Sequence, residues 1–172
     1  AGAAGVAAAR ATPAAPATPA APAAGGTVRD RIVAIARWGI ANEAQIHYAQ
    51  QRPIDGVTAV APKLPLSTDC SGFATLCYRW AGAPDPHGRG FDGQGYTGTL
   101  LQKGRVIAAA DAQPGDMVVW GAAPGTHVAL VLEGGADPLL CSHGQEKGPV
   151  ATRFSNQNAY HGPPATFLRF LD

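Results

Sequence analysis

The sequence lacks any apolar run that approaches the roughly 20 residues of a membrane-spanning helix, and it carries little net charge. With 13 Lys and Arg residues against 12 Asp and Glu residues, the formal net charge is +1 at pH 7. A chain so close to neutrality has no strong field to recruit nucleic acid or an anionic membrane surface. We therefore expect no nucleic-acid partner and no insertion into a membrane.

Cysteine is also scarce, with three residues in 172. Cys70 and Cys77 fall on one expected helix, which holds their Cα atoms about 10.5 Å apart, beyond the roughly 7 Å that a disulfide allows. We expect Cys77 and Cys141 to be buried structural residues. A zinc site of Cys141, His143 and His127 stays open as a rival, although no Cys-x-x-Cys or His-x-x-x-His pair supports it.

The first 26 residues lack the basic, apolar and cleavage regions of a signal peptide. They are mostly alanine, and their prolines recur at three-residue intervals, which matches a polyproline II helix. We expect residues 1–26 to form a disordered linker to another domain, and residues 27–172 to form the folded domain. Because the chain starts at Ala1 without Met, we expect a processed protein or a segment of a longer one.

Helical patterns occupy the first half of the folded domain and strand patterns the second. A capping box at Thr27 and Asp30 predicts a helix over Val28–Glu43, and residues 45–67 are expected to be irregular. Further helices are predicted to follow Asp69 and to cover 96–102. Strands are predicted at 105–107, 117–120, 126–133, 139–143, 150–154 and 165–171. This order indicates an α+β domain with an antiparallel sheet of about five to six strands.

Cys70 stands at the start of a predicted helix that runs to Trp80 and stops before Gly82. Thr68 or Asp69 supplies the N-cap oxygen, so Cys70 falls in the first turn, where backbone N–H groups are unpaired. These groups are expected to lower the pKa of the thiol. We interpret Cys70 as a nucleophile, with the N–H groups of Cys70 and Ser71 stabilising an oxyanion.

Two histidines are predicted to meet this thiol from neighbouring strands. His127 begins the strand 126–133, and a hairpin returns the chain through 139–143, so that His143 neighbours His127. His127 would act as the base, and His143 would hydrogen-bond its second ring nitrogen and fix the tautomer. The other three histidines, His47, His87 and His161, are expected to be solvated.

Four segments in this order resemble the NlpC-type cell-wall peptidases, a bacterial and phage family with a papain-like core. They are Asp69-Cys70-Ser71-Gly72-Phe73, Pro114-Gly115-Asp116-Met117-Val118-Val119-Trp120, His127-Val128-Ala129-Leu130-Val131-Leu132 and Ser142-His143. The resemblance covers roughly residues 28 to 171. It implies N-terminal helices packed on the antiparallel sheet, and it assigns the catalytic set to Cys70, His127 and His143, with Gln145 as the alternative to His143.

The resemblance implies a peptidoglycan hydrolase that cleaves stem peptides, typically between D-glutamate and diaminopimelate or lysine, without a metal or other cofactor. The loop around Gly88 to Gly95 and the segment from Ser142 to Glu146 look most like phage-encoded lysins or tail-associated hydrolases. Such a protein would act at the bacterial cell wall, released there by a phage or secreted. An N-acetylmuramoyl-L-alanine amidase and a non-catalytic wall-binding or tail module are the alternatives.

One departure from the family pattern concerns the tyrosine that helps to stabilise the tetrahedral intermediate. Many members carry this tyrosine and a Gly-Gly pair shortly before the Asp-Cys motif. Here Tyr48 lies further upstream, and no Gly-Gly pair separates it from Cys70. Tyr48 is therefore assigned to substrate or oxyanion positioning only through this resemblance. Ser71, through its N–H group at the helix start, and Gln145 are the other residues expected to position the substrate or the oxyanion.

Overall fold

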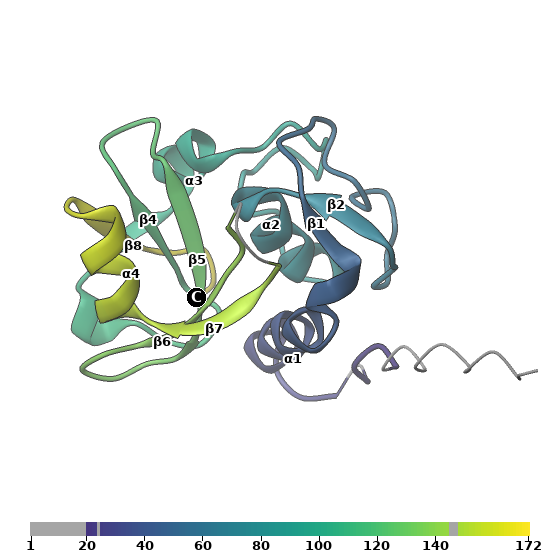
Figure 1. Ribbon diagram of the computed structural model, residues 1–172, viewed down its shortest axis with the longest axis horizontal. Coiled ribbons are helices and arrows are strands. Elements are labelled where there is room, and N and C mark those ends of the chain that lie inside the picture. The colour runs from purple at the N-terminus through teal and green to yellow at the C-terminus, as the bar shows by residue number, and fades with distance from the viewer. Residues whose placement is uncertain (1–19, 24, 145–147) are drawn as a thin grey trace, which may run out of the picture.

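Helices precede strands along most of the chain, in the predicted order (Figure 1). The computed structural model describes residues 20–23, 25–144 and 148–172, so most of the expected linker, residues 1–19 and 24, lies outside it. The elements are α1 (Val28–Ala41), a 3-10 turn (Glu43–Gln45), β1 (Ile46–Tyr48), β2 (Leu66–Thr68), α2 (Cys70–Trp80), α3 (Thr97–Lys103), β3 (Arg105–Ile107), a second 3-10 turn (Ala109–Asp111), β4 (Met117–Trp120), β5 (His127–Glu133), β6 (Leu139–Ser142), β7 (Val150–Arg153), α4 (Phe154–His161) and β8 (Ala165–Arg169).

The two long helices begin at side-chain caps. The Thr27 hydroxyl accepts a 3.1 Å hydrogen bond from the Asp30 N–H, and the Asp30 carboxylate accepts one of 2.8 Å from the Thr27 N–H, which confirms the capping box. Asp69 caps α2 by accepting from the Gly72 N–H at 2.7 Å, so Cys70 is the first residue of that helix. Among the described residues, no helix is long and apolar enough to cross a membrane.

Six strands form one antiparallel sheet in the order β3-β8-β4-β5-β6-β7. Strand β5 lies inside it, between β4 and β6, and every residue of β5 except Glu133 is buried. Sheet and helices together confirm the predicted α+β class. His127 is the first residue of β5, so the position of its backbone is set by the pairing of β5 with β4 and β6.

The two faces of the sheet are covered by different helices. On one face, Val128 and Leu130 pack with Phe73 of α2 and with α1 in the larger apolar cluster. On the other face, Trp120 and Val131 pack in a second cluster that α4 covers. Figure 1 shows α4 on the side of the sheet away from α1 and α2.

Helix α4 was not predicted, because its sequence has no apolar stripe at helical spacing. Contacts from elsewhere in the chain hold it instead. Asp137, in the turn between β5 and β6, accepts hydrogen bonds from the Ser155 N–H at 2.8 Å and the Ser155 hydroxyl at 2.7 Å. The Phe154 ring stacks on Trp120 at 5.9 Å between centroids. The helix is therefore anchored to the same hairpin that carries the second predicted histidine.

The expectation of an irregular segment over 45–67 was wrong at both of its ends. Strands β1 and β2 form a short parallel pair in which Ile46 lies opposite Leu66 and Tyr48 opposite Thr68. Strands of three residues paired across such a long connection leave no local periodicity in the sequence. The pairing brings Tyr48 beside the residue that precedes Asp69.

Candidate active site

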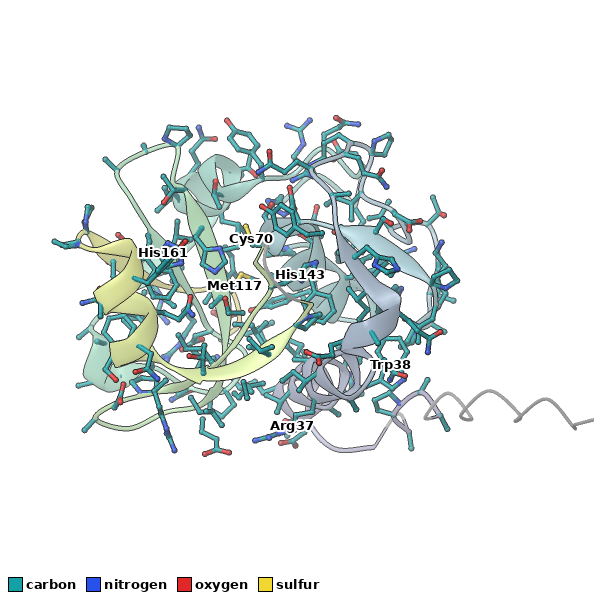
Figure 2. All side chains as sticks on the ribbon, in the orientation of Figure 1. Arg37, Trp38, Cys70, Met117, His143 and His161 are labelled. Atoms are coloured by element: carbon teal, nitrogen blue, oxygen red, sulfur yellow. The ribbon has the colours of Figure 1, made fainter. Side chains whose placement is uncertain are left out.

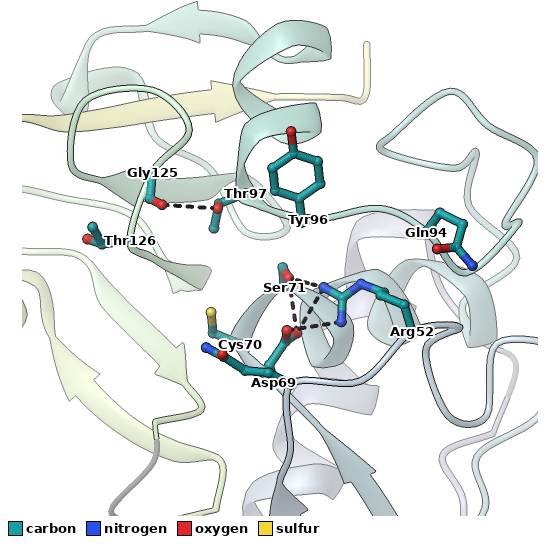
Figure 3. Close-up of a pocket in the computed structure, with 10 residues that line it drawn as sticks. Arg52, Asp69, Cys70, Ser71, Gln94, Tyr96, Thr97, Gly125 and Thr126 are labelled. Carbon is teal, nitrogen blue, oxygen red and sulfur yellow. Dashed lines mark hydrogen bonds and ion pairs between the residues drawn. The ribbon is translucent and has the colours of Figure 1, made fainter.

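Cys70 borders an open cavity of about 340 Å³ (Figure 3). The residue is only 7% exposed. The cavity is lined mainly by polar side chains, which include Gln50, Arg52, Asp69, Ser71, Gln94 and Tyr96. An extended polar ligand could therefore reach the thiol from this side.

The surroundings of Cys70 raise the pKa of its thiol to about 11, first because the group is buried and second because the Asp69 carboxylate is adjacent. Hydrogen bonds from the N–H groups of Val128, Ser71 and Cys70 itself act in the opposite direction. The expectation of a lowered pKa was therefore wrong. The first-turn amides are present as predicted, but burial and the capping carboxylate outweigh them.

Arg52 binds the first turn of α2 from the loop that follows β1 (Figure 3). Its guanidinium lies 3.0 Å from Asp69 Oδ2 and donates to the Ser71 hydroxyl at 2.9 Å. The Ser71 hydroxyl in turn donates to Asp69 Oδ1 at 3.0 Å. The Ser71 side chain is thus engaged within the protein, and its backbone N–H is one of the groups whose hydrogen bond lowers the pKa of Cys70.

His127 lies on the adjoining strand, one residue before the amide that contacts the Cys70 sulfur. It lines a second cavity of about 180 Å³, and Gln50 and Thr126 border both cavities. Burial, followed by the neighbouring His161 and His143, lowers the pKa of His127 to about 3. At neutral pH the site therefore holds a neutral thiol beside a neutral imidazole.

Ser142, rather than His143, hydrogen-bonds the ring of His127, with 2.8 Å between Ser142 Oγ and His127 Nε2. In the register of β5 and β6, Ala129 lies opposite Ser142. Side chains alternate along a strand, so Ser142 shares a face with His127 and Ala129 while the next residue turns away. The hydrogen bond that was expected from His143 is made by its neighbour.

His143 is 2% exposed and lies on the side of Cys70 toward β1 and β2 (Figure 2). Its Nε2–H donates to the carbonyl oxygen of Thr68 at 2.8 Å. Its ring contacts the rings of Tyr48 and Phe73, with centroids 5.4 and 5.8 Å apart. His143 therefore ties the end of β6 to the residue that precedes the Asp69 cap.

The two remaining predicted positions are Tyr48 and Gln145. Tyr48 lines the cavity that His127 borders, and its hydroxyl accepts a hydrogen bond from Gln50 Nε2 at 3.2 Å. The structure thus brings Tyr48 to the candidate site despite its unusual place in the sequence. Gln145 lies outside the described residues.

Helix α4 supplies residues that the sequence did not single out. The His161 ring stacks on His127 with 4.4 Å between centroids and an angle of 14° between the planes. Gln157 Oε1 accepts from the Ser142 hydroxyl at 3.3 Å and from His161 Nε2 at 3.2 Å. The only available signal was the pair Gln157 and His161 at one-turn spacing, and it carries no weight unless the helix is known.

His87 and His161 were expected to be solvated, and both predictions were wrong. His87 is 2% exposed, and its two ring nitrogens lie 2.8 Å from the Thr75 hydroxyl and 2.7 Å from the Thr99 hydroxyl. His161 is half-buried against His127. His47, by contrast, is exposed as expected.

The other cysteines lie in the apolar core. Cys77 and Cys141 are fully or almost fully buried and form no disulfide, and burial raises the pKa of Cys141 to about 12. Within the described ranges, no group of three or more His, Cys, Asp or Glu side chains could hold a metal ion. The zinc hypothesis at Cys141, His143 and His127 therefore has no support from the arrangement of these side chains.

The sequence matches no family model and no curated protein, but several solved structures share the fold, among them the following three. The NlpC/p60 domain of the peptidoglycan hydrolase SagA aligns at a TM-score of 0.54 and 21% identity, over 83% of this chain and 98% of that one. An NlpC/P60 family protein from Bacillus cereus ATCC 10987 aligns at 0.54 and 18%, over 89% and 42%. The peptidoglycan hydrolase RipB from Mycobacterium tuberculosis aligns at 0.53 and 17%, over 84% and 67%.

The chain therefore has the NlpC/p60 fold, with its papain-like arrangement of helices on an antiparallel sheet. This confirms the fold that the sequence motifs implied. At these identities the likeness establishes architecture, and the chemistry has to be argued from Cys70 and the groups around it.

Proposed function

We propose that this protein is a peptidoglycan hydrolase, a cysteine endopeptidase that cleaves stem-peptide amide bonds. The bond expected from the sequence motifs joins D-glutamate to diaminopimelate or lysine. The observation that carries the proposal is the placement of Cys70 at the start of α2, against the backbone of β5 next to His127. Two of the structures that share the fold are described as peptidoglycan hydrolases, which favours the same substrate class.

The first chemical step begins from a neutral pair. As the Cys70 sulfur bonds to the scissile carbonyl carbon, its proton passes to the ring nitrogen of His127 that does not face Ser142. The carbonyl π electrons move to oxygen, and the oxyanion is stabilised by the N–H groups of Cys70 and Ser71. Both N–H groups belong to the first turn of α2, where no intrahelical carbonyl accepts from them.

The second half of the reaction returns the proton. The imidazolium of His127 protonates the departing amine as the C–N bond breaks, which leaves a thioester on Cys70. His127 then takes a proton from water as the water oxygen attacks the thioester, and it gives that proton back to the leaving sulfur. Tyr48 and Ser71 are proposed to position the substrate. His143 is proposed to act by holding β6 against the Cys70 helix.

Digestion of purified peptidoglycan tests this proposal. Diaminopimelate-type and lysine-type sacculi are incubated with the wild type and with Cys70→Ala, and the released fragments are identified by mass spectrometry. We expect fragments that end at D-glutamate from the wild type and none from the variant, which should keep its circular dichroism spectrum. Release of intact stem peptides would indicate an amidase, and binding to sacculi without cleavage would indicate a wall-binding module; either result contradicts the proposal.

A second pair of variants tests the base. His127→Gln should abolish cleavage, because the glutamine amide cannot take the proton of Cys70. His47→Gln changes an exposed histidine on β1 in the same way, so it serves as the matched control and should retain activity. Because the substrate is part of the wall, we propose that the protein acts at the bacterial cell wall. It would reach the wall either as a phage-encoded lysin or tail hydrolase or by secretion.

A further inference from the structure

The hydroxyl of Ser142 joins two elements, β6 and α4, at the ring of His127. Its oxygen lies 2.8 Å from His127 Nε2 and 3.3 Å from Gln157 Oε1. A hydroxyl has one proton to donate, and the carbonyl oxygen of Gln157 can only accept. The Ser142 proton therefore goes to Gln157, and Ser142 Oγ is left to accept from His127.

This assignment fixes the tautomer of His127. If Ser142 Oγ accepts, then His127 Nε2 carries the proton and donates it. Because burial keeps the imidazole neutral at ordinary pH, it has only one proton, so Nδ1 carries the lone pair. A base that takes a proton from the thiol needs a lone pair on the nitrogen that does not face Ser142, and that nitrogen is Nδ1.

Helix α4 also restrains the plane of the His127 ring. The His161 ring stacks on it at 4.4 Å, and Trp120 contacts His161 with centroids 5.2 Å apart. The Nε2–H of His161 donates to the same Gln157 oxygen at 3.2 Å. Both contacts are made to Gln157 Oε1, so in this orientation the amide presents its acceptor to Ser142 and to His161.

We propose that Gln157 and His161 are positioning residues for the proposed hydrolysis: through Ser142 and through ring stacking, they hold His127 as the Nε2–H tautomer with Nδ1 basic. This proposal rests on the proposed function for its effect on rate. The tautomer itself is a property of the free protein. The titratable groups around His127 are Cys70 from α2, Tyr48 from β1, His161 and Tyr160 from α4, and His143, which follows β6 and acts on His127 through its charge.

Removal of the acceptor is the direct perturbation. Gln157→Met keeps the length of the side chain and leaves the Ser142 hydroxyl free to donate to His127 Nε2, which favours the opposite tautomer. Gln157→Glu keeps an acceptor and adds a charge. Asn156→Leu is a comparable change at the next residue of α4, where the side chain is exposed, and it serves as the matched control.

The primary readout is the ring tautomer, measured without substrate by 15N NMR on protein labelled in its five histidines, with His127 assigned from the His127→Gln spectrum. We expect the Nε2–H form in the wild type, in Asn156→Leu and in Gln157→Glu, and a mixture or the Nδ1–H form in Gln157→Met. An Nδ1–H form of His127 in the wild type, or an unchanged Nε2–H form in Gln157→Met, overturns the proposal. Should Gln157→Met fail to fold, Ser142→Ala tests the same hydrogen bond.

The kinetic readout is kcat for wall-fragment release. We expect Gln157→Met to lower kcat about tenfold, the factor that one hydrogen bond of ordinary strength is worth, with KM nearly unchanged. Gln157→Glu should retain most of the activity and shift the acid limb of the pH profile upward, because the new carboxylate favours the imidazolium. If Gln157→Met lost activity while the His127 tautomer stayed unchanged, the proposed action of Gln157 on His127 through Ser142 would be wrong. A wild type with the expected tautomer and no wall cleavage would instead contradict the proposed function alone.

Discussion

Alkylation of Cys70 should reveal a thiol that is protonated at neutral pH. Burial and the Asp69 carboxylate raise its pKa to about 11, whereas a free cysteine titrates near 8.5. That difference lowers the thiolate fraction at pH 7, and with it the rate of reaction with iodoacetamide, about 300-fold relative to an unstructured cysteine peptide. The rate should still rise about tenfold per pH unit between pH 7 and pH 10, because the thiolate remains the minor form.

The Asp69→Asn variant separates the two causes. Asparagine is as good an N-cap as aspartate, so α2 should keep its start while the neighbouring negative charge is removed. The pKa of Cys70 should then fall, and alkylation should become faster at every pH below the new value. Asp92→Asn, a change at an exposed loop carboxylate, is the matched control and should leave the rate unchanged.

The assay is peptide mapping by mass spectrometry after timed exposure to iodoacetamide, which follows the Cys70 peptide separately from those of Cys77 and Cys141. A rate that is already at its plateau at pH 7 would mean that Cys70 is ionised beside an imidazolium. Such a result would refute the neutral pair and the proton transfer that the proposed mechanism derives from it.

Three further predictions concern stability, each measured by urea unfolding. Burial between Thr75 and Thr99 lowers the pKa of His87 to about 4. The folded state therefore resists protonation, and the free energy of unfolding should fall by about 3 kcal/mol as the pH drops from about 6.5 to 4. His87→Gln should flatten this pH dependence. Asp116→Asn, in a carboxyl group 1% exposed that binds two arginines, should cost about 3 kcal/mol. Gly39→Ala places a Cβ against the Phe73 ring and should cost about 1–3 kcal/mol, whereas unchanged unfolding would contradict this close approach.

The sequence was sufficient to predict those parts of the site that depend on local patterns. Asp69 caps α2 because an acceptor oxygen stands directly before a helical run, and Cys70 follows as the first helical residue. His127 begins a strand because alternating and buried apolar residues follow it. The error at His143 has a single cause: hairpin register decides which of two adjacent residues shares a face with His127, and a one-residue difference moves the side chain to the other face.

Tertiary contacts, rather than local patterns, create the parts that could not be predicted. Helix α4 depends on Asp137 and Trp120, and the pair β1 and β2 depends on a parallel contact across an irregular loop. The pKa of Cys70 likewise depends on tertiary contacts. The sequence places the thiol among favourable amides, but only the packed structure shows that little solvent reaches it.

A buried neutral thiol makes the orientation of His127 decisive for the proposed reaction. In an ion pair, the proton has already moved before substrate binds, so the imidazole tautomer no longer matters. In the neutral pair, proton transfer accompanies attack and needs the lone pair on the nitrogen toward sulfur. The hydrogen bonds from His127 through Ser142 to Gln157 supply that condition from β6 and α4. The same burial that raises the thiol pKa thus makes the rate depend on α4, a helix on the side of the sheet away from α2.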